Sequence, residues 1–268
     1  GHLWGRTTTE TVDTIRAELG DPRIEVAAIG PSGEKLVRLA AIINMGNRAN
    51  GRTGMGAVMG SKLLKAIVVR GTSRKLPFAD TAALGRLAKW GANEIPNNGD
   101  VLDLRINGTE GVLEGQHAAG GLPTFNYNAG QFEHYEEIGG ATMTATILKN
   151  RETCYSCAVR CKRAVETEWE GRPVHERHGG PEYETASTFG SYCGIRDLHA
   201  IALANQICNE NGLDTIGTGA TIAWTMDCFT DGVLSEAEIG FPAPFGDAKA
   251  MIRLLEMIVA REGIGDVL

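Results

Sequence analysis

The chain has 268 residues, enough for one large domain or two smaller ones, and 43% of them are hydrophobic. Its formal net charge of −7 argues against a nucleic-acid partner, because phosphate binding needs clustered lysine and arginine. No apolar run approaches the roughly 20 residues that span a bilayer, so no membrane partner is expected. The amino-terminal GHLWGRTTT lacks signal-peptide features, which predicts a cytoplasmic protein if residue 1 is the natural start.

Residues 1–75 have the pattern of an α/β segment. Thr8 or Thr9 is placed to cap a helix that runs through about Glu18. A turn at 30–33 and a glycine-rich stretch at 46–60 separate short apolar runs. These runs favour strands at 24–29, 36–43 and 65–70.

From residue 76 the pattern becomes mostly helical, and a boundary is expected within 72–78. Asp80 predicts a helix through Trp90, residues 91–131 look rich in loops, and a helix at 133–148 is interrupted at 139–140. A short strand is expected at 165–169, and Pro181 favours a helix start with Glu182 and Glu184 in its first turn. Further helices are predicted at 197–209, 215–229 and 247–261. The fold class is therefore α+β.

Three of the six cysteines crowd together as Cys154-x-x-Cys157-x-x-x-Cys161. This pattern is typical of metal ligation in a reducing compartment. Three close thiolates with a distant fourth favour a [4Fe–4S] cluster, while a zinc site or buried free thiols remain alternatives. The remaining candidates for a fourth ligand are equally suited to the core; they are Cys193, Cys208 and Cys228.

A second candidate site is the loop that follows the apolar run at 36–43. Its glycines let backbone N–H groups approach an anion, and its arginines supply fork-shaped donors suited to phosphate. The loop matches neither a Walker motif nor a dinucleotide fingerprint, so a tight turn remains the alternative. The residues concerned are Arg48, Gly51, Arg52, Gly54 and Gly56.

The stretch 175–184, HERHGGPEYE, is dense in proton-transfer groups. A glutamate here would suit general acid or base chemistry beside a metal centre. His175 and His178 have the types needed for a metal pair, with an exposed loop as the alternative. For Glu182 and Glu184 the alternative is charge at a helix amino terminus.

Six segments in order resemble the aldehyde ferredoxin oxidoreductase family, over essentially the whole chain. They are HLWGRTTTET near the start, GRTGMGAVMGSKLLKAIVVRGT at 51–72, LPTFN at 122–126, CYSCAVRC at 154–161, GPEYET at 180–185 and NGLDTIGTGA at 211–220. The resemblance implies a tungsten (or molybdenum) bis-pterin centre beside one [4Fe–4S] cluster. It further implies oxidation of aldehydes to carboxylic acids, with electrons passed to ferredoxin or an iron–sulfur electron-transfer subunit.

The resemblance also assigns residues. Glu184 matches the glutamate near tungsten, and backbone groups near Ala49 and Asn50 match those that hold the pterin phosphates and their bridging Mg²⁺. The pterin motif D-x-x-G-L-C/D matches 209–214, with Asn209, Gly212, Leu213 and Asp214 in its fixed positions. Three of the four cluster ligands match Cys154, Cys157 and Cys161.

The chain departs from the family pattern at Asn209, where Asp is preferred, at Leu63, where S-K-N-L-K has Asn, and at Phe125, where L-P-T-R-N has Arg. Family members are roughly twice as long, so the chain is expected to be a fragment that is inactive alone. Residues 1–75 would end the β-rich pterin-cradling domain, and 76–268 would form the mostly helical domain. The second pterin motif, the fourth cysteine and a catalytic histidine would then lie outside the chain.

Other hypotheses remain open from the sequence. The chain could be an iron–sulfur electron-transfer module without pterin, or a zinc-stapled structural domain. A related tungsten enzyme would act on carboxylic acids or aromatic acyl-CoA thioesters. A homodimer or a hetero-oligomer is expected.

Overall fold

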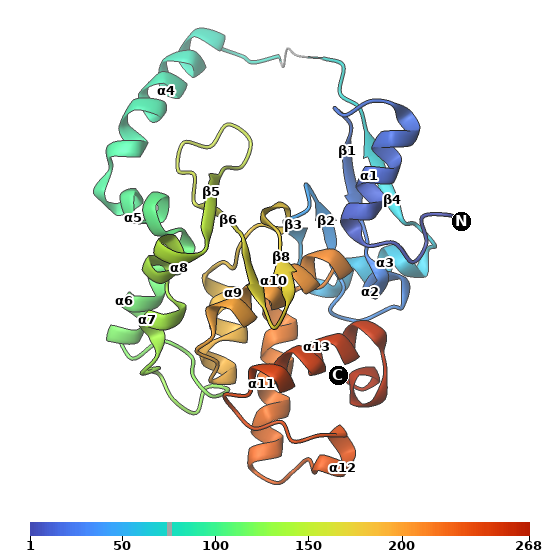
Figure 1. The fold of residues 1–268 in the computed structure, drawn as a ribbon. Helices are drawn as coiled ribbons and strands as arrows, with labels where there is room; N and C mark the ends of the chain where they lie inside the picture. Colours follow the sequence, from blue (N-terminus) through green and yellow to red (C-terminus); the bar gives the residue numbers. More distant parts are fainter. Residues whose placement is uncertain (74–76) are drawn as a thin grey trace.

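The computed structural model describes residues 1–73 and 77–268 and confirms the α+β class (Figure 1). A small antiparallel sheet lies on one side of the molecule, and a group of helices around the central α10 occupies the other. The expected boundary at 72–78 includes residues 74–76, which lie outside the described residues, so the division into two domains stays a prediction.

The amino-terminal part is a sheet with one helix packed on it. α1 (Thr8–Leu19) begins with a capping box, in which the Thr7 side chain accepts from the Glu10 N–H and the Glu10 side chain accepts from the Thr7 N–H. The cap is thus Thr7, not the expected Thr8 or Thr9. The sheet order is β3-β2-β1-β4, all antiparallel. The strands are β1 (Glu25–Ala28), β2 (Ile42–Asn44), β3 (Arg48–Asn50) and β4 (Ala66–Val69).

The strand expected at 36–43 is mostly wrong. A single helical turn, α2 (Pro31–Glu34), replaces the expected turn at 30–33, and strand β2 starts only at Ile42. Leu36 has φ 61°, a left-handed conformation that no strand can include. The Val37 N–H then donates to the Ser32 carbonyl, so this apolar run folds back on α2.

The loop-rich assignment of 91–131 is wrong for 91–118 and confirmed for 119–131, which form turns and an isolated bridge. After α4 (Thr81–Glu94), capped by Asp80 as predicted, come α5 (Gly99–Asn107) and α6 (Val112–Ala118). Pro96 and Gly108 lie between these helices and do not prevent them from forming. Pro96 is part of a 3₁₀ turn, and Gly108 has φ 75°. The predicted interruption at 139–140 is confirmed between α7 (Tyr135–Ile138) and α8 (Gly140–Thr146).

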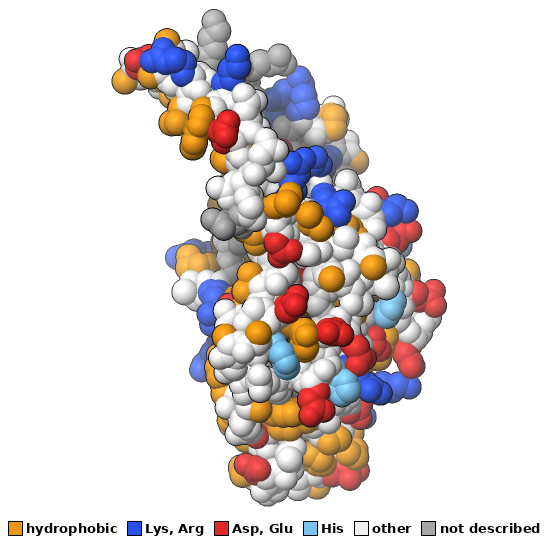
Figure 2. Space-filling model, turned by 90° about the vertical axis from the view of Figure 1, so that its left-hand side faces the viewer, with side chains coloured by type: hydrophobic (Ala, Val, Ile, Leu, Met, Phe, Trp, Pro, Cys, Tyr) orange, Lys and Arg blue, Asp and Glu red, His pale blue; other side chains and the backbone are white. Residues whose placement is uncertain are grey.

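Figure 2 shows the face that carries α4 to α8, with α4 standing out from the rest of the molecule and acidic side chains gathered lower down. The described residues of α4 include no buried side chain. In the described part of the chain, no helix is long and apolar enough to cross a membrane.

Two hairpins connect this helical group to the core. β5 (Leu148–Glu152) pairs antiparallel with β6 (Lys162–Val165), and β7 (Thr167–Trp169) pairs with β8 (Arg172–Val174). The strand expected at 165–169 is divided between β6 and β7, and β5 was not expected. The cysteine-rich loop joins β5 to β6 (Figure 1).

The core is centred on α10 (Leu198–Asn211), which is buried on almost every side. Asp197 caps it as predicted, and Asp247 caps the last long helix in the same way. Val37 and Ala40 from the amino-terminal part belong to the same buried cluster, whereas α1 and β1 enclose a second, smaller cluster of their own. The helices around α10 are α9 (Tyr183–Phe189), α11 (Thr215–Thr230), α12 (Glu236–Ile239) and α13 (Ala248–Ala260).

Candidate functional site

A cleft of about 260 Å³ lies where the glycine-rich loop meets the junction of α10 and α11. Its walls come from four stretches of the sequence: the glycine-rich loop, the start of β6, the segment 178–185 and the end of α10. The lining residues that were predicted from the sequence are Arg48, Ala49, Gly51, Arg52, Asn209, Leu213 and Asp214. The structure therefore brings together two motifs that are more than 150 residues apart.

Backbone contacts explain why these motifs meet. The Ala41 N–H donates to the Gly212 carbonyl at 2.7 Å, and the Asp214 N–H donates to the Leu39 carbonyl at 2.9 Å. Gly212 ends α10 in a left-handed conformation with φ 70°, and a Cβ there would lie 2.7 Å from the Gly30 backbone nitrogen. Only glycine satisfies both constraints without strain.

The glycine-rich loop reaches its position by a tight reversal after β3. Thr53 (φ 77°) and Gly54 (φ 71°) are both left-handed, and α3 (Met55–Ser61) follows at once. A Cβ on Gly56 would lie 2.6 Å from the Ala41 carbonyl oxygen, so the loop packs directly on the strand below. Gly54 and Gly56 therefore shape the loop, and the residues that line the cleft are those before them.

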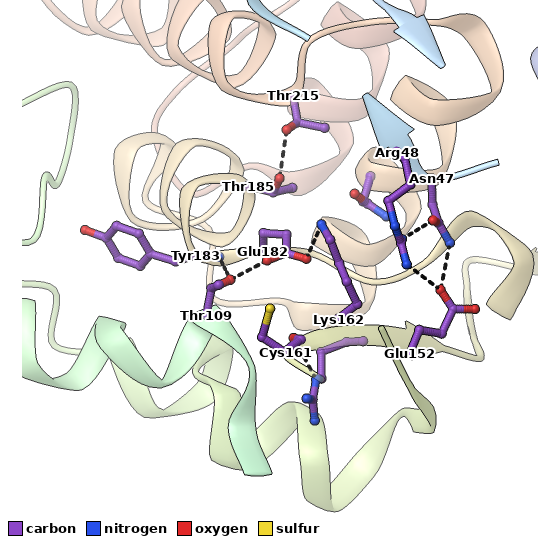
Figure 3. A network of polar contacts seen from close by, with 12 residues as sticks. Asn47, Arg48, Thr109, Glu152, Cys161, Lys162, Glu182, Tyr183, Thr185 and Thr215 are labelled. Carbon is purple, nitrogen blue, oxygen red and sulfur yellow. Dashed lines mark hydrogen bonds and ion pairs between the residues drawn. The ribbon is translucent and has the colours of Figure 1, made fainter. Parts of the chain in front are cut away.

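The two arginines of the loop are held differently. Arg48 is 3.3 Å from Glu152 and also donates to Asn47, as Figure 3 shows, yet its Nε is buried without a partner among the described residues. Arg52 lies 3.6 Å from the Asp214 carboxylate and is largely exposed. An orphaned buried donor beside a second guanidinium suits a ligand that carries anionic oxygens.

The 209–214 motif supplies polar groups from the opposite wall. The Asn209 side chain donates to the His178 carbonyl at 3.1 Å. Asp214 is nearly buried and caps α11, accepting from the Ile216 and Gly217 N–H groups at 3.1 Å each. Its carboxylate is thus fixed as part of the fold and faces the cleft at the same time.

The cysteine-rich loop lies beside this cleft. The Cys157 N–H donates to the Cys154 carbonyl at 3.1 Å, and Cys154 is exposed while Cys157 and Cys161 are half-buried. The described residues include no group of three or more His, Cys, Asp or Glu side chains close enough for one metal ion. A single zinc ion needs such convergence, whereas cluster thiolates bind different irons and can lie farther apart.

The other three cysteines, which were the candidates for a fourth cluster ligand, are buried or half-buried among the helices. Cys193 and Cys208 are fully buried, and burial raises the pKa of both thiols. The Cys193 thiol donates to the Thr188 carbonyl at 3.3 Å, deep in the helical core. Cys228, on α11, is half-buried. Cys193 and Cys208 are therefore core residues of this fold, and the position of the fourth ligand implied by the resemblance stays a prediction.

The structure separates the two glutamates of the GPEYET segment. Glu184 is exposed and does not line the cleft; it lies near Tyr183 and Tyr192, where its charge contributes to raising their pKa values, burial being the larger cause. Glu182 does line the cleft, 2.7 Å from Lys162 and 2.6 Å from the Thr109 hydroxyl. His175 is exposed, whereas His178 is buried, with Nε2 3.2 Å from Glu210 and Nδ1 unpartnered among the described residues.

Two buried charged residues were not predicted from the sequence: Arg163, which lines the cleft, and Glu110, which lies near Glu182. Arg163 is 2% exposed and donates to five backbone carbonyls, among them Cys161 and Ile106, and burial lowers its pKa. Glu110 is 1% exposed; burial, and then the nearby Glu182, raise its pKa well above the usual range. Neither residue lies in a recognisable motif, so the sequence held no signal for either.

Two family models match the chain. One, described as the N-terminal domain of aldehyde ferredoxin oxidoreductase, matches residues 1–71, and another, described as its domains 2 and 3, matches residues 86–268. The chain belongs to the aldehyde ferredoxin oxidoreductase family. The resemblance inferred from the six sequence segments is thereby confirmed.

Relatives within this family are named as tungsten enzymes. The tungsten-containing aldehyde ferredoxin oxidoreductases of Thermococcus kodakarensis and Pyrococcus furiosus are 40% and 38% identical to the whole chain, which spans 44% of each. The WOR-like subunit of an aliphatic sulfonate oxidoreductase from Pyrococcus furiosus is 31% identical over 90% of the chain, which spans 38% of it. The chain thus covers less than half of the relatives it matches.

A solved structure of similar fold is named for a different reaction. It is the active-site complex BamBC of benzoyl coenzyme A reductase, bound to 1,5-dienoyl-CoA. It superposes with a TM-score of 0.76 at 26% identity, over 99% of this chain and 41% of that one. Membership of the family therefore establishes an oxidoreductase scaffold but not one reaction.

Proposed function

We propose that this chain carries part of the cofactor site of a tungsten-dependent oxidoreductase that converts aldehydes to carboxylic acids. The observation that carries the proposal is the cleft, which joins the arginine-and-glycine loop to the 209–214 motif. The orphaned Arg48 Nε and His178 Nδ1 are buried at its walls, so the residues present fit a polar, anionic ligand.

Each wall has its own role in this proposal. Arg48, Arg52 and the backbone from Ala49 through Arg52, on the loop that Gly54 and Gly56 shape, would hold the phosphates of a bis-pterin cofactor with their Mg²⁺. Asn209 and Asp214, with the turn at Gly212 and Leu213, bind the pterin ring edge. Tungsten, or molybdenum, in that cofactor supplies the oxygen-atom chemistry when bound. Glu184 exchanges a proton with the substrate at its carboxylate.

Cys154, Cys157 and Cys161 provide three ligands of a [4Fe–4S] cluster in the proposal. Three thiols within one hairpin loop match the donor set of such a cluster. Electrons leave through it to ferredoxin or to an iron–sulfur subunit. Two of the similar proteins are named as a subunit or a complex, which favours an oligomeric assembly.

Metal analysis of protein purified without oxygen tests the proposal. Tungsten or molybdenum together with pterin, iron and sulfide is the expected result. Iron and sulfide alone identify an electron-transfer module, and zinc without brown colour identifies a structural domain; either outcome contradicts the proposal. Cys157→Ser is expected to remove the cluster iron, whereas Cys208→Ser, in the core, keeps it unless folding fails.

A second reaction deserves a parallel assay, because the fold also matches the benzoyl coenzyme A reductase complex. Reduction of aromatic acyl-CoA thioesters or of carboxylic acids is the alternative activity. We infer further that the 268 residues alone do not oxidise aldehydes, since the chain spans 44% of its tungsten-enzyme relatives and Glu184 is exposed. Turnover by this chain alone contradicts that inference.

A further inference from the structure

The Glu182 carboxylate, which lines the cleft, is held at both of its oxygens. Lys162 Nζ lies 2.7 Å from its Oε1, and the Thr109 hydroxyl donates to its Oε2 at 2.6 Å. The Thr109 oxygen in turn accepts from the Tyr183 N–H at 3.0 Å, which fixes the hydroxyl proton toward Glu182. Both carboxylate oxygens of Glu182 therefore accept a hydrogen bond, one of them from an ammonium group.

This charge pair lies beside a cysteine of the hairpin loop. Lys162 follows Cys161 directly at the start of β6, and Figure 3 shows the Cys161 sulfur on the side of Thr109 and Glu182. The Lys162 and Glu182 side chains are only 24% and 28% exposed, so solvent screens them incompletely. Arg163, one residue further, fixes the backbone here through its bond to the Cys161 carbonyl.

We propose that Glu182 and Lys162 set the reduction potential of the cluster bound at Cys161, with Glu182 lowering the potential and Lys162 raising it. The inference rests on the proposed [4Fe–4S] cluster. Reduction adds one electron to the cluster and no proton. A fixed negative charge nearby disfavours the added electron, and a fixed positive charge favours it. Glu182 and Lys162 thus act through the cluster, by changing its reduction potential, and are not catalytic residues.

Single charge removals have opposite expected effects. Glu182→Gln leaves the Lys162 charge uncompensated, so the reduction potential of the cluster is expected to rise by about 59 mV. At a given applied potential, the ratio of reduced to oxidised cluster then rises about tenfold. Lys162→Met leaves Glu182 uncompensated and lowers the ratio by about the same factor. The double variant is expected to return close to the original potential, because the charges are removed together.

The measurement is a potentiometric titration followed by electron paramagnetic resonance on protein with its cluster assembled. Glu166→Gln is the matched control, because the Lys149–Glu166 ion pair also lies on the β5–β6 hairpin, but both of its side chains are more than half exposed and its charged atoms are 3.4 Å apart. It is expected to leave the potential unchanged. Glu182→Asp retains the charge and is expected to stay close to the original potential.

The outcomes separate this inference from the proposed function. Absence of iron and sulfide from the unaltered protein defeats the proposed cluster itself. An intact cluster whose potential moves in neither single variant, or in the same direction in both, overturns the roles of Glu182 and Lys162. If Glu182→Gln fails to assemble a cluster, the reduction potential of Lys162→Met becomes the deciding measurement. A potential that does not fall in Lys162→Met overturns the inference.

Discussion

The Arg52 Nε lies 3.6 Å from Oδ2 of Asp214, which connects the glycine-rich loop to the cap of α11. Asp214 therefore has two roles, one in holding a helix and one in balancing a cationic loop. These roles can be separated, because Asp247 caps α13 with the same pattern of backbone hydrogen bonds and does not line the cleft.

Asp214→Ala is expected to cost about 1 kcal/mol of the free energy of unfolding, as the loss of a helix cap does. It is also expected to strengthen pyrophosphate binding about twofold to fivefold, because Arg52 loses its carboxylate partner. Urea unfolding and calorimetric titration measure the two effects. Asp247→Ala should reproduce the first effect without the second. Equal pyrophosphate affinity in all three proteins contradicts the role of Asp214 in the cleft.

Glu110 makes stability depend on pH. Its pKa is raised in the folded protein, so it stays protonated there while the unfolded chain releases the proton above about pH 4.5. The stabilisation is complete below that pH and is lost as pH rises toward the folded pKa, at up to about 1.4 kcal/mol per pH unit. The nearby charges are Glu182, which acts in the same direction, and Arg163, which opposes it.

Glu110→Gln removes this titration. Unfolding in urea between pH 5 and 8 should show a gain in stability for the variant that increases with pH. Glu114→Gln, an exposed glutamate one turn away on α6, is the control and should leave the pH profile unchanged. A variant curve parallel to that of the original protein contradicts a neutral Glu110.

Arg163 ties the cysteine-rich hairpin to the end of α5. Arg163→Met removes the donor of five part-buried hydrogen bonds to carbonyl oxygens, so a loss of about 2–4 kcal/mol is expected in the free energy of unfolding. Arg160→Met, which removes an exposed arginine with one backbone bond at 2.9 Å, should cost less than about 0.5 kcal/mol. Similar losses in both variants contradict the structural role of Arg163.

Leu63 occupies a backbone conformation that suits another residue. It has φ 54° and is 80% exposed, at the position where the family pattern S-K-N-L-K has Asn. Leu63→Asn is expected to raise the free energy of unfolding by about 0.5–1 kcal/mol, because Asn tolerates left-handed geometry. Thermal unfolding measures the gain. Leu63→Ala keeps the Cβ and should show no such gain; an equal gain from alanine would assign the effect to lost surface hydrophobicity.

Local signals in the sequence predicted the elements whose ends they mark. Asp80, Asp197 and Asp247 cap the helices expected from them, and the break at 139–140 is where the glycines indicated. The run 36–43 failed because apolar composition does not show that Leu36 adopts a left-handed backbone. That conformation depends on the packing of α2 against α3, which no local pattern reveals.

The candidate site was predicted in its parts but not in its arrangement. Sequence motifs identified Arg48, Arg52, Asn209 and Asp214, and the structure places all four around one cleft. The motif GPEYET did not show which glutamate enters the cleft, because Glu182 and Glu184 differ by two residues at a helix start and point to different surroundings. Only the tertiary partners, Lys162 and Thr109, distinguish Glu182.

The hydrogen bonds between the sheet and the end of α10 impose an order on biosynthesis. The Thr8 hydroxyl donates to the Asn209 carbonyl across 201 residues, and Ala41 bonds to Gly212. The glycine-rich loop therefore leaves the ribosome long before its opposite wall exists, and contacts of such sequence separation form slowly. Any cofactor that occupies this cleft must be inserted after residue 214 has been made, because the first wall alone does not enclose it.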